Sequence, residues 1–404
     1  MIITQTPYRI SFFGGGTDYP DWYLQHGGQV LSTTIDKYVY ISCRYLPPFF
    51  EHKLRLVYSV VECCQTADEL NHPAARAILN CLGIKSGLEI HYDGDLPARS
   101  GMGSSSSFSV GLINTIFALK EQTIDPHKLA LEAIRIEQDV IGESVGSQDQ
   151  VNAAYGGFNR IRFKTDGQID ISPSSISAER KRQLSDNLML FYTGIGRTAN
   201  TISASYARNT ESKSQPLNKL LDIVEKATDL VEGEESLEQF GYLLHESWIE
   251  KKQLSVAVTN PQVDLIYDKA LNAGALGGKL CGAGGGGMIL TNDIVLAEKA
   301  RYLITQAKDD PVRYVHNEIG YRETFNDVFA SFVNAVDRTS NPQPFFFAIN
   351  GMKMHGELVG VVSEKFIKDA DGDIEIVETT SLILPVDENT VASTDVRVRS
   401  WSRA

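Results

Sequence analysis

Residues 96–111 read LPARSGMGSSSSFSVG, and this stretch decides the fold. Before it, Leu88, Ile90 and Tyr92 alternate as in a β-strand, and after it apolar residues recur at helical spacing. The glycines and four serines therefore join a strand to the first turn of a helix. Because glycines let backbone amides converge and a helix N-terminus carries partial positive charge, the loop is suited to holding phosphate.

The serine-rich loop is not the common P-loop, because neither GxxxxGKS nor GxxxxGKT occurs in the chain. Its serines can hydrogen-bond a phosphate or ligate Mg²⁺. They can also simply cap the helix, since serine is a preferred N-cap residue. The loop alone leaves these alternatives open.

Glycine is unevenly distributed along the chain. The 33 glycines crowd into residues 14–16, 101–103, 156–157 and 274–287, the last of which reads GALGGKLCGAGGGG. Clusters at separate points predict several loops that need a positive φ or a close backbone approach. Ordinary turn chemistry is the alternative for any single cluster.

Glu137 is a charged residue in an apolar stripe. It follows Ile134 by three residues and precedes Ile141 by four, so a helix over this segment turns its carboxylate inward. A buried carboxylate has to be paired, neutralised or bound to a metal. We expect either an internal salt bridge or a magnesium ligand near the serine loop.

Three further polar residues are candidates for chemistry. Asp149 is a lone carboxylate among small residues and amides, and a general base for a hydroxyl needs such a group. Arg9 lies on an expected strand, where an arginine can stabilise the charge of a transferred phosphate. Asp18 follows a triple glycine and is a candidate ligand for sugar hydroxyls. A helix cap for Asp149 and a turn for Asp18 are the plainer interpretations.

The composition excludes several classes of protein. The 404 residues allow two or three domains, and a hydrophobic content of 42% excludes a disordered chain. Lys+Arg 38 minus Asp+Glu 51 gives −13, which argues against a nucleic-acid partner. With no apolar run of membrane-span length, no signal peptide and five cysteines without a CxxC pair, we expect a cytoplasmic protein with reduced thiols, no zinc site and no membrane partner.

The order of expected elements predicts an α+β chain with two lobes. Strands dominate the first half, and Val39, Ile41 and Cys43 alternate within one of them. Helices are expected later, over residues 220–231, 237–254 and 261–273. The polar, turn-rich residues 173–185 indicate a boundary, so we assign the lobes to residues 1–180 and 181–321.

Residues 322–404 have a different character and are expected to form a mostly β appendage. Strands are expected over residues 345–347, 358–362, 381–386 and 391–401. The run DADGD (369–373) has its glycine at the fourth position, whereas a calcium loop has it at the sixth. We therefore expect a hairpin turn there.

The glycine-rich motifs resemble the three signatures of the GHMP kinases (galactokinase, homoserine, mevalonate and phosphomevalonate kinases). PYRISFFGGGTDY (7–19) resembles the first motif, SGMGSSSSFSVG (100–111) the phosphate loop and KLCGAGGGG (279–287) the third. All three occur in order and at the family's spacing, over about residues 1–305. The resemblance implies an N-terminal lobe like ribosomal protein S5 domain 2, a ferredoxin-like C-terminal lobe, and binding of ATP and Mg²⁺.

The resemblance also implies a role for each matching residue. Asp149 matches the catalytic aspartate and Arg9 the basic residue of the first motif, while Ser105 and Glu137 match the pair that holds Mg²⁺ with the ATP phosphates. The phosphate loop is matched by Gly101, Gly103, Ser104, Ser105 and Ser106. We place substrate contacts at Thr17, Asp18, Arg197 and Gly285.

Within the family, LSTTIDKYVY (31–40), GESVGSQDQ (142–150) and LLHESWIEKKQLS (243–255) look like the D-glycero-D-manno-heptose 7-phosphate kinases. This likeness implies ATP-dependent phosphorylation of an anomeric hydroxyl, on the way to GDP-heptose for surface polysaccharide. A substrate that already carries a phosphate needs a second anion site. The candidates for it are Lys37, Arg44 and Arg197, of which Arg197 is the first choice.

Two other functions stay open at this point. One is another GHMP sugar kinase, of the fucose or galactose type, and the other is a catalytically silent sensor of sugar and nucleotide. The heptose kinases finish soon after the third motif, whereas this chain continues for most of a hundred residues. The role of that appendage stays open, and one interpretation is partner binding or a homodimer.

Overall fold

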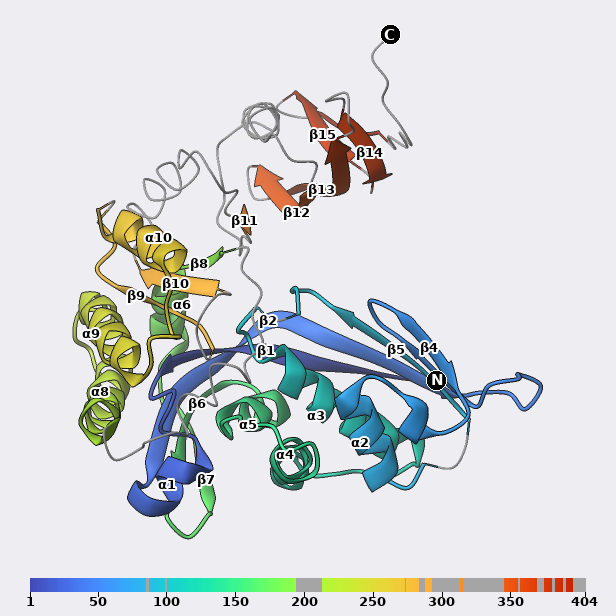
Figure 1. Cartoon of the computed structure of the whole chain (residues 1–404). Coiled ribbons are helices and arrows are strands. Elements are labelled where there is room, and N and C mark those ends of the chain that lie inside the picture. The colour runs from blue at the N-terminus through green and yellow to red at the C-terminus, as the bar shows by residue number, and fades with distance from the viewer. Residues whose placement is uncertain are drawn as a thin grey trace. The chain divides into compact units, whose positions relative to one another are not determined.

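The computed structural model divides the chain into two compact units, residues 1–304 and 305–404, and each is described by itself (Figure 1). The structure describes residues 1–84, 87–98, 100–193, 213–272, 274–282, 288–292, 313–314, 345–354, 357–368, 374–379, 382–387 and 390–394.

The first unit contains a seven-stranded sheet in the order β4–β3–β5–β2–β6–β7, with β1 also paired to β2. Its strands are β1 (Ile2–Phe13), β2 (Gly28–Tyr45), β3 (Leu54–Val57), β4 (Val61–Cys64), β5 (Leu88–Gly94), β6 (Phe158–Phe163) and β7 (Ile169–Pro173). Strand β2 is 18 residues long. One of its edges pairs with β1, and the opposite edge pairs first with β6 and then with β5. β3 runs parallel to β5, and the other pairs are antiparallel.

Helices cover one face of this sheet (Figure 1). They are α2 (Pro73–Cys81), α3 (Ser104–Leu119), α4 (Pro126–Arg135) and α5 (Gln148–Tyr155), and α1 (Pro20–His26) precedes β2. The alternation predicted for Val39, Ile41 and Cys43 is confirmed, since all three are buried while their neighbours along β2 are not. The predicted strand, glycine loop and helix around residues 96–111 are also confirmed, as β5 leads through the loop into α3.

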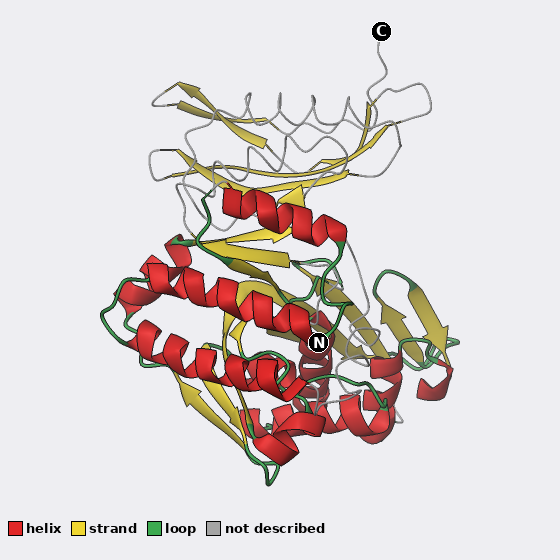
Figure 2. Ribbon diagram, turned by 60° about the vertical axis from the view of Figure 1, so that its left-hand side comes forward, coloured by secondary structure: helices red, strands yellow, loops and turns green. Residues whose placement is uncertain are grey.

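A second group of helices begins after residue 213 and forms another layer of the first unit. It consists of α8 (Ser214–Glu232), α9 (Glu238–Leu254) and α10 (Pro261–Asn272), with a small antiparallel sheet of β8 (Leu188–Tyr192), β10 (Met288–Asn292) and β9 (Gly278–Leu280). α8 and α9 lie side by side (Figure 2). These three helices confirm the predicted ones; α9 and α10 agree with them to within one residue at each end, whereas α8 begins six residues before the predicted start at residue 220.

Aromatic side chains join this helical layer to the first sheet. Phe240 of α9 is fully buried, and its ring lies 5.2 Å from that of Phe12 and 5.0 Å from that of Phe13, both on β1. Edge-to-face pairs at these distances add to the burial of apolar area. The strand that carries Arg9 is therefore held from both sides.

The polar stretch 173–185 contains a helix, where we expected a turn-rich boundary. α6 (Ala178–Asp186) begins there because the Ser177 hydroxyl accepts a hydrogen bond from the Arg180 amide at 3.1 Å. Serine capping and a run of good helix formers outweigh the polar composition. The predicted lobe boundaries at residues 180 and 321 stay predictions.

The described part of the second unit consists of strands. β12 (Phe345–Met354), β13 (Glu357–Lys368) and β14 (Ile374–Thr379) form an antiparallel sheet, and β15 (Leu382–Asp387) pairs with β16 (Thr390–Thr394). A short strand, β11 (Arg313–Tyr314), precedes them. The predicted strands 345–347 and 358–362 fall on β12 and β13, and the described parts of 381–386 and 391–401 fall on β15 and β16. β14 was not predicted, and residues 369–373, 381 and 395–401 lie outside the described residues.

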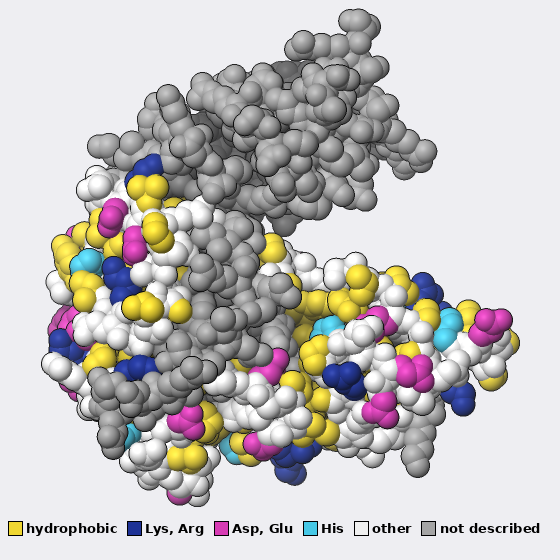
Figure 3. All heavy atoms as spheres, in the orientation of Figure 1, with side chains coloured by type: hydrophobic (Ala, Val, Ile, Leu, Met, Phe, Trp, Pro, Cys, Tyr) yellow, Lys and Arg dark blue, Asp and Glu magenta, His cyan; other side chains and the backbone are white. Residues whose placement is uncertain are grey.

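Two observations concern membranes and nucleic acids as partners. Among the described residues, no helix combines the length and the apolar character that crossing a membrane requires. On the face shown in Figure 3, Lys and Arg side chains of the described residues are scattered among Asp and Glu, without a continuous basic stripe.

Replacing Phe240 by alanine tests the packing of the helical layer against β1. Removing a fully buried aromatic ring leaves a cavity, so we expect the free energy of unfolding to fall by about 3–5 kcal/mol in chemical denaturation. The control is Tyr242→Ala on the same helix, whose side chain is half exposed and whose loss is expected to change stability little. Equal losses in the two variants would contradict this packing.

Candidate active site

The glycine loop before α3 has the backbone shape that a phosphate cradle requires. Gly101 and Gly103 both have φ of +78°, and a Cβ on Gly101 would lie 2.6 Å from the carbonyl oxygen of Cys281. Gly103 is the N-cap of α3, and no side chain caps the helix. The alternative of a plain serine cap is therefore not what the structure shows, and the first-turn amides of α3 keep no side-chain partner among the described residues.

The serines of this loop point in different directions. Ser104 is half-buried and Ser105 is exposed at the start of α3. The Ser106 hydroxyl donates to Glu137 Oε2 at 2.9 Å, and the Ser107 hydroxyl donates to the carbonyl oxygen of Pro7. The serine that contacts Glu137 is thus Ser106 and not Ser105, because it is one helical step further round α3.

Glu137 is buried as its periodicity predicted, with 1% of its surface exposed. It lies in a π-helical turn (Ile136–Val140) that follows α4, a distortion often found at functional sites. Its Oε2 accepts from Ser106 and, at 2.5 Å, from Gln150 Nε2. Its Oε1 makes no hydrogen bond of normal geometry among the described residues, although the Ser109 hydroxyl lies beside the carboxyl, and no ion pair to Glu137 is present there.

The surroundings of Glu137 fit a magnesium ion. Burial raises the pKa of its carboxyl to about 7, against the opposing effect of its hydrogen-bond donors. A cation at the unpaired Oε1 would remove the cost of burying this charge. The described residues hold no cluster of three His, Cys, Asp or Glu side chains. Mg²⁺ beside a nucleotide usually takes one or two protein carboxylates, phosphate oxygens and several waters.

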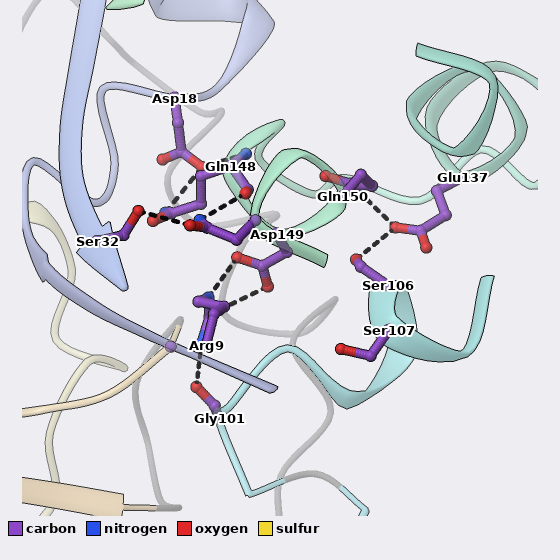
Figure 4. A network of polar contacts seen from close by, with 12 residues as sticks. Arg9, Asp18, Ser32, Gly101, Ser106, Ser107, Glu137, Gln148, Asp149 and Gln150 are labelled. Atoms are coloured by element: carbon purple, nitrogen blue, oxygen red, sulfur yellow. Dashed lines mark hydrogen bonds and ion pairs between the residues drawn. The ribbon is translucent and has the colours of Figure 1, made fainter. Parts of the chain in front are cut away.

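Arg9 and Asp149 form a bidentate ion pair beside the glycine loop (Figure 4). Arg9 Nε donates to Asp149 Oδ1 at 2.7 Å and Nη2 donates to Oδ2 at 2.5 Å. Nη1 donates to the carbonyl oxygen of Gly101 at 2.7 Å, so the same guanidinium holds the loop. The Arg9 side chain is buried, whereas 24% of the Asp149 side chain is exposed, which leaves the carboxylate open to a ligand.

Asp18 is buried next to the helix that carries Asp149. Its carboxylate accepts from the Gly16 amide and from Gln148 Nε2, each at 2.9 Å. Burial raises the pKa of this carboxyl. The approach is so close that a Cβ on Gly146 would lie 1.9 Å from Asp18 Oδ2. In this arrangement Asp18 fixes the loop before α5.

Of the other residues predicted to contact the substrate, one is buried and two are not described. Thr17 is buried, and its hydroxyl is used by the carbonyl oxygen of Gly14 and by the amide of Gln29, so its geometry supports a role in the glycine turn and not an open contact. Arg197 and Gly285 lie outside the described residues.

The two alternative anion-site residues lie on β2. Lys37 is half-buried. Arg44 pairs with Glu89 and lies ten residues beyond Thr34, the partner of Arg9 in the sheet, which is roughly 33 Å at 3.3 Å per residue. Arg44 is therefore not part of the site.

Two buried lysines were not predicted as functional, although both lie in quoted motifs. Lys251 of α9 donates to the carbonyl oxygen of Gly282, and Lys279 of β9 donates to that of Phe12 at 2.9 Å. Burial lowers the pKa of Lys251 to about 8 and lowers that of Lys279 well below its usual value. A Cβ on Gly282 would lie 2.7 Å from the carbonyl oxygen of Gly101, so Lys251 holds the third motif against the phosphate loop.

Comparison with known proteins agrees with this geometry. The model of the GHMP kinase N-terminal domain matches residues 68–157, and that of the GHMP kinase C-terminal domain matches residues 225–291. A D-glycero-alpha-D-manno-heptose 7-phosphate kinase of Campylobacter jejuni is 27% identical over 312 residues, covering 71% of this chain and 88% of that protein. A galactokinase of Pyrococcus furiosus is 26% identical over 362 residues, covering 76% and 98%.

A solved structure supports the fold. A D-glycero-D-manno-heptose 1-phosphate kinase of Bacteroides thetaiotaomicron superposes with a TM-score of 0.56 at 20% identity, over 78% of this chain and 97% of that one. The predicted α+β kinase fold is thereby confirmed. Both GHMP kinase domain models match this chain, in order and over separate ranges, and the chain is therefore similar to the GHMP kinases.

Proposed function

We propose that this protein transfers the γ-phosphoryl group of ATP to the anomeric hydroxyl of D-glycero-D-manno-heptose 7-phosphate, giving the 1,7-bisphosphate. The observation that carries the proposal is the part-exposed carboxylate of Asp149, held by Arg9 at the edge of the phosphate loop. The likeness to a heptose 7-phosphate kinase supports the choice of sugar. The product would serve GDP-heptose synthesis for surface polysaccharide.

Asp149 is suited to receive the proton of the acceptor hydroxyl. Each of its oxygens accepts one hydrogen bond from Arg9, and each keeps a second lone pair for the substrate. The demand on this base is small, because an anomeric hydroxyl is more acidic than an ordinary alcohol and a loose phosphoryl-transfer transition state requires little proton removal.

The phosphate loop and Arg9 supply the electrostatic part of the reaction. The first-turn amides of α3 would face the phosphate groups, and Arg9 would add a fixed positive charge next to the base. Glu137 and the exposed Ser105 would hold Mg²⁺, which would neutralise charge on the ATP phosphates.

The second phosphate of the substrate requires an anion site, which we propose at Arg197. Its neighbours in TGIGRTAN (193–200) are glycine and threonine, which suit a loop around an anion. Sugar kinases for galactose and fucose also resemble the chain and would not need this site. The phosphorylation state of the sugar therefore distinguishes the proposals.

Replacing Asp149 by asparagine tests the general base. The amide keeps the shape of the side chain but cannot accept a proton, so we expect kcat to fall about 10²–10⁴-fold while nucleotide still binds. The measurement is a coupled assay of ADP release together with ATP binding by calorimetry. Asp166→Asn, in an exposed hairpin, is the matched control. Unchanged turnover in the Asp149 variant would end the assignment.

A panel of heptoses and hexoses, each free and phosphorylated at the terminal carbon, tests the substrate. We expect kcat/KM to be highest for heptose 7-phosphate, and Arg197→Ala to raise KM for that sugar at least tenfold with little effect on free sugars. Highest activity with free galactose or fucose would favour the other sugar kinases. An unchanged KM in the Arg197 variant would place the second anion site elsewhere.

A further inference from the structure

Three consecutive side chains at the start of α5 each contact a different charged group (Figure 4). Gln148 Nε2 donates to Asp18 Oδ2 at 2.9 Å, Asp149 pairs with Arg9, and Gln150 Nε2 donates to Glu137 Oε2 at 2.5 Å. Successive residues of a helix point about 100° apart, so one helical turn reaches three separate parts of the site.

Gln150 has features that stability alone does not explain. Its side chain is fully buried, and its Oε1 has no hydrogen-bond partner among the described residues. Leaving a buried polar atom unpaired destabilises the folded protein. An apolar side chain of the same length would avoid this cost, so the contact of the Gln150 amide with Glu137 requires another reason.

The contact determines which oxygen of Glu137 is free. Ser106 and Gln150 both donate to Oε2, from α3 and α5 respectively. Among the described residues Oε1 makes no hydrogen bond of normal geometry, and the Ser109 hydroxyl, which lies beside the carboxyl, is unpaired as well. A carboxylate held by two donors on one oxygen cannot rotate without breaking both bonds. The other oxygen therefore keeps a single fixed direction.

We infer that Gln150 is a positioning residue for the nucleotide-bound cation: it fixes Glu137 so that Oε1 is its metal-binding atom. The inference rests on the proposed function, because it takes Glu137 as a ligand of the nucleotide-bound Mg²⁺. The residue next to it in the chain is the proposed base. The first turn of α5 thus carries the proposed base and also positions the Glu137 carboxylate that would bind the cation.

The test is binding of Mn²⁺ to the full-length protein with ADP and without any sugar, measured by electron paramagnetic resonance. Gln150→Met keeps the length of the side chain but removes the donor. We expect Mn²⁺ affinity in the ADP complex to fall about tenfold, as for other residues that orient metal ligands. In turnover, the Mg²⁺ concentration for half-maximal rate should rise by a similar factor, while kcat at saturating Mg²⁺ changes less than threefold.

Two variants serve as matched controls. Gln148→Met removes the neighbouring amide, which contacts Asp18, and Gln168→Met changes an exposed glutamine in the β6–β7 hairpin. Both should bind Mn²⁺ with ADP like the wild type. If Gln150→Met fails to fold by circular dichroism, Gln150→Asn provides the same test, since the shorter amide cannot reach Glu137.

Wild-type Mn²⁺ affinity in a folded Gln150 variant would overturn the inference. So would an equal loss of affinity in the Gln148 variant, because it would show that the effect comes from loosening of α5. These outcomes are independent of the sugar. A kinase that shows the Mn²⁺ effect but does not phosphorylate heptose 7-phosphate would contradict the proposed function and leave the role of Gln150 intact.

Discussion

The ion pair between Arg9 and Asp149 is the interaction on which the rest of the site depends. Its members come from β1 and α5, 140 residues apart, and the third contact of the guanidinium is to Gly101 in the phosphate loop. Taking a charge pair out of water is costly unless good geometry and further hydrogen bonds offset the loss of hydration. Here each of the three guanidinium nitrogens has an acceptor on Asp149 or Gly101, and these bonds bring the base and the phosphate loop together.

The chain as a whole is acidic, whereas the site contains several buried basic side chains. The chain carries a net charge of −13, yet Arg9, Lys251 and Lys279 are all buried near Asp18 and Asp149. The lowered pKa values of the two lysines show how strongly burial opposes further positive charge there. The two lysines instead bind backbone carbonyls, and Lys251 holds Gly282 close to Gly101. Their contribution is to fix glycine-rich backbone where the phosphates have to fit.

Much of the site was predictable from local patterns. The periodicity around Glu137 gave its burial correctly, and the glycines before α3 do have positive φ and a close backbone approach. Such patterns predict the structure of a single helix, strand or turn, but not how these elements pack against one another. They could not show that Ser106, and not Ser105, contacts Glu137, or that Thr17 is occupied by backbone, because these depend on how α3, π-turn and glycine turn pack. Gln150 and Lys251 were missed because such residues are usually exposed, so their type gives no sign of burial.

A double-mutant cycle on Arg9 and Asp149 tests the central claim most directly. The variants are Arg9→Met, Asp149→Asn and the combination, with kcat for phosphoryl transfer measured in each at saturating ATP and sugar. If the two side chains act as one unit, the combined variant should be about as slow as the slower single variant. Losses that multiply, as for independent residues, would contradict the account.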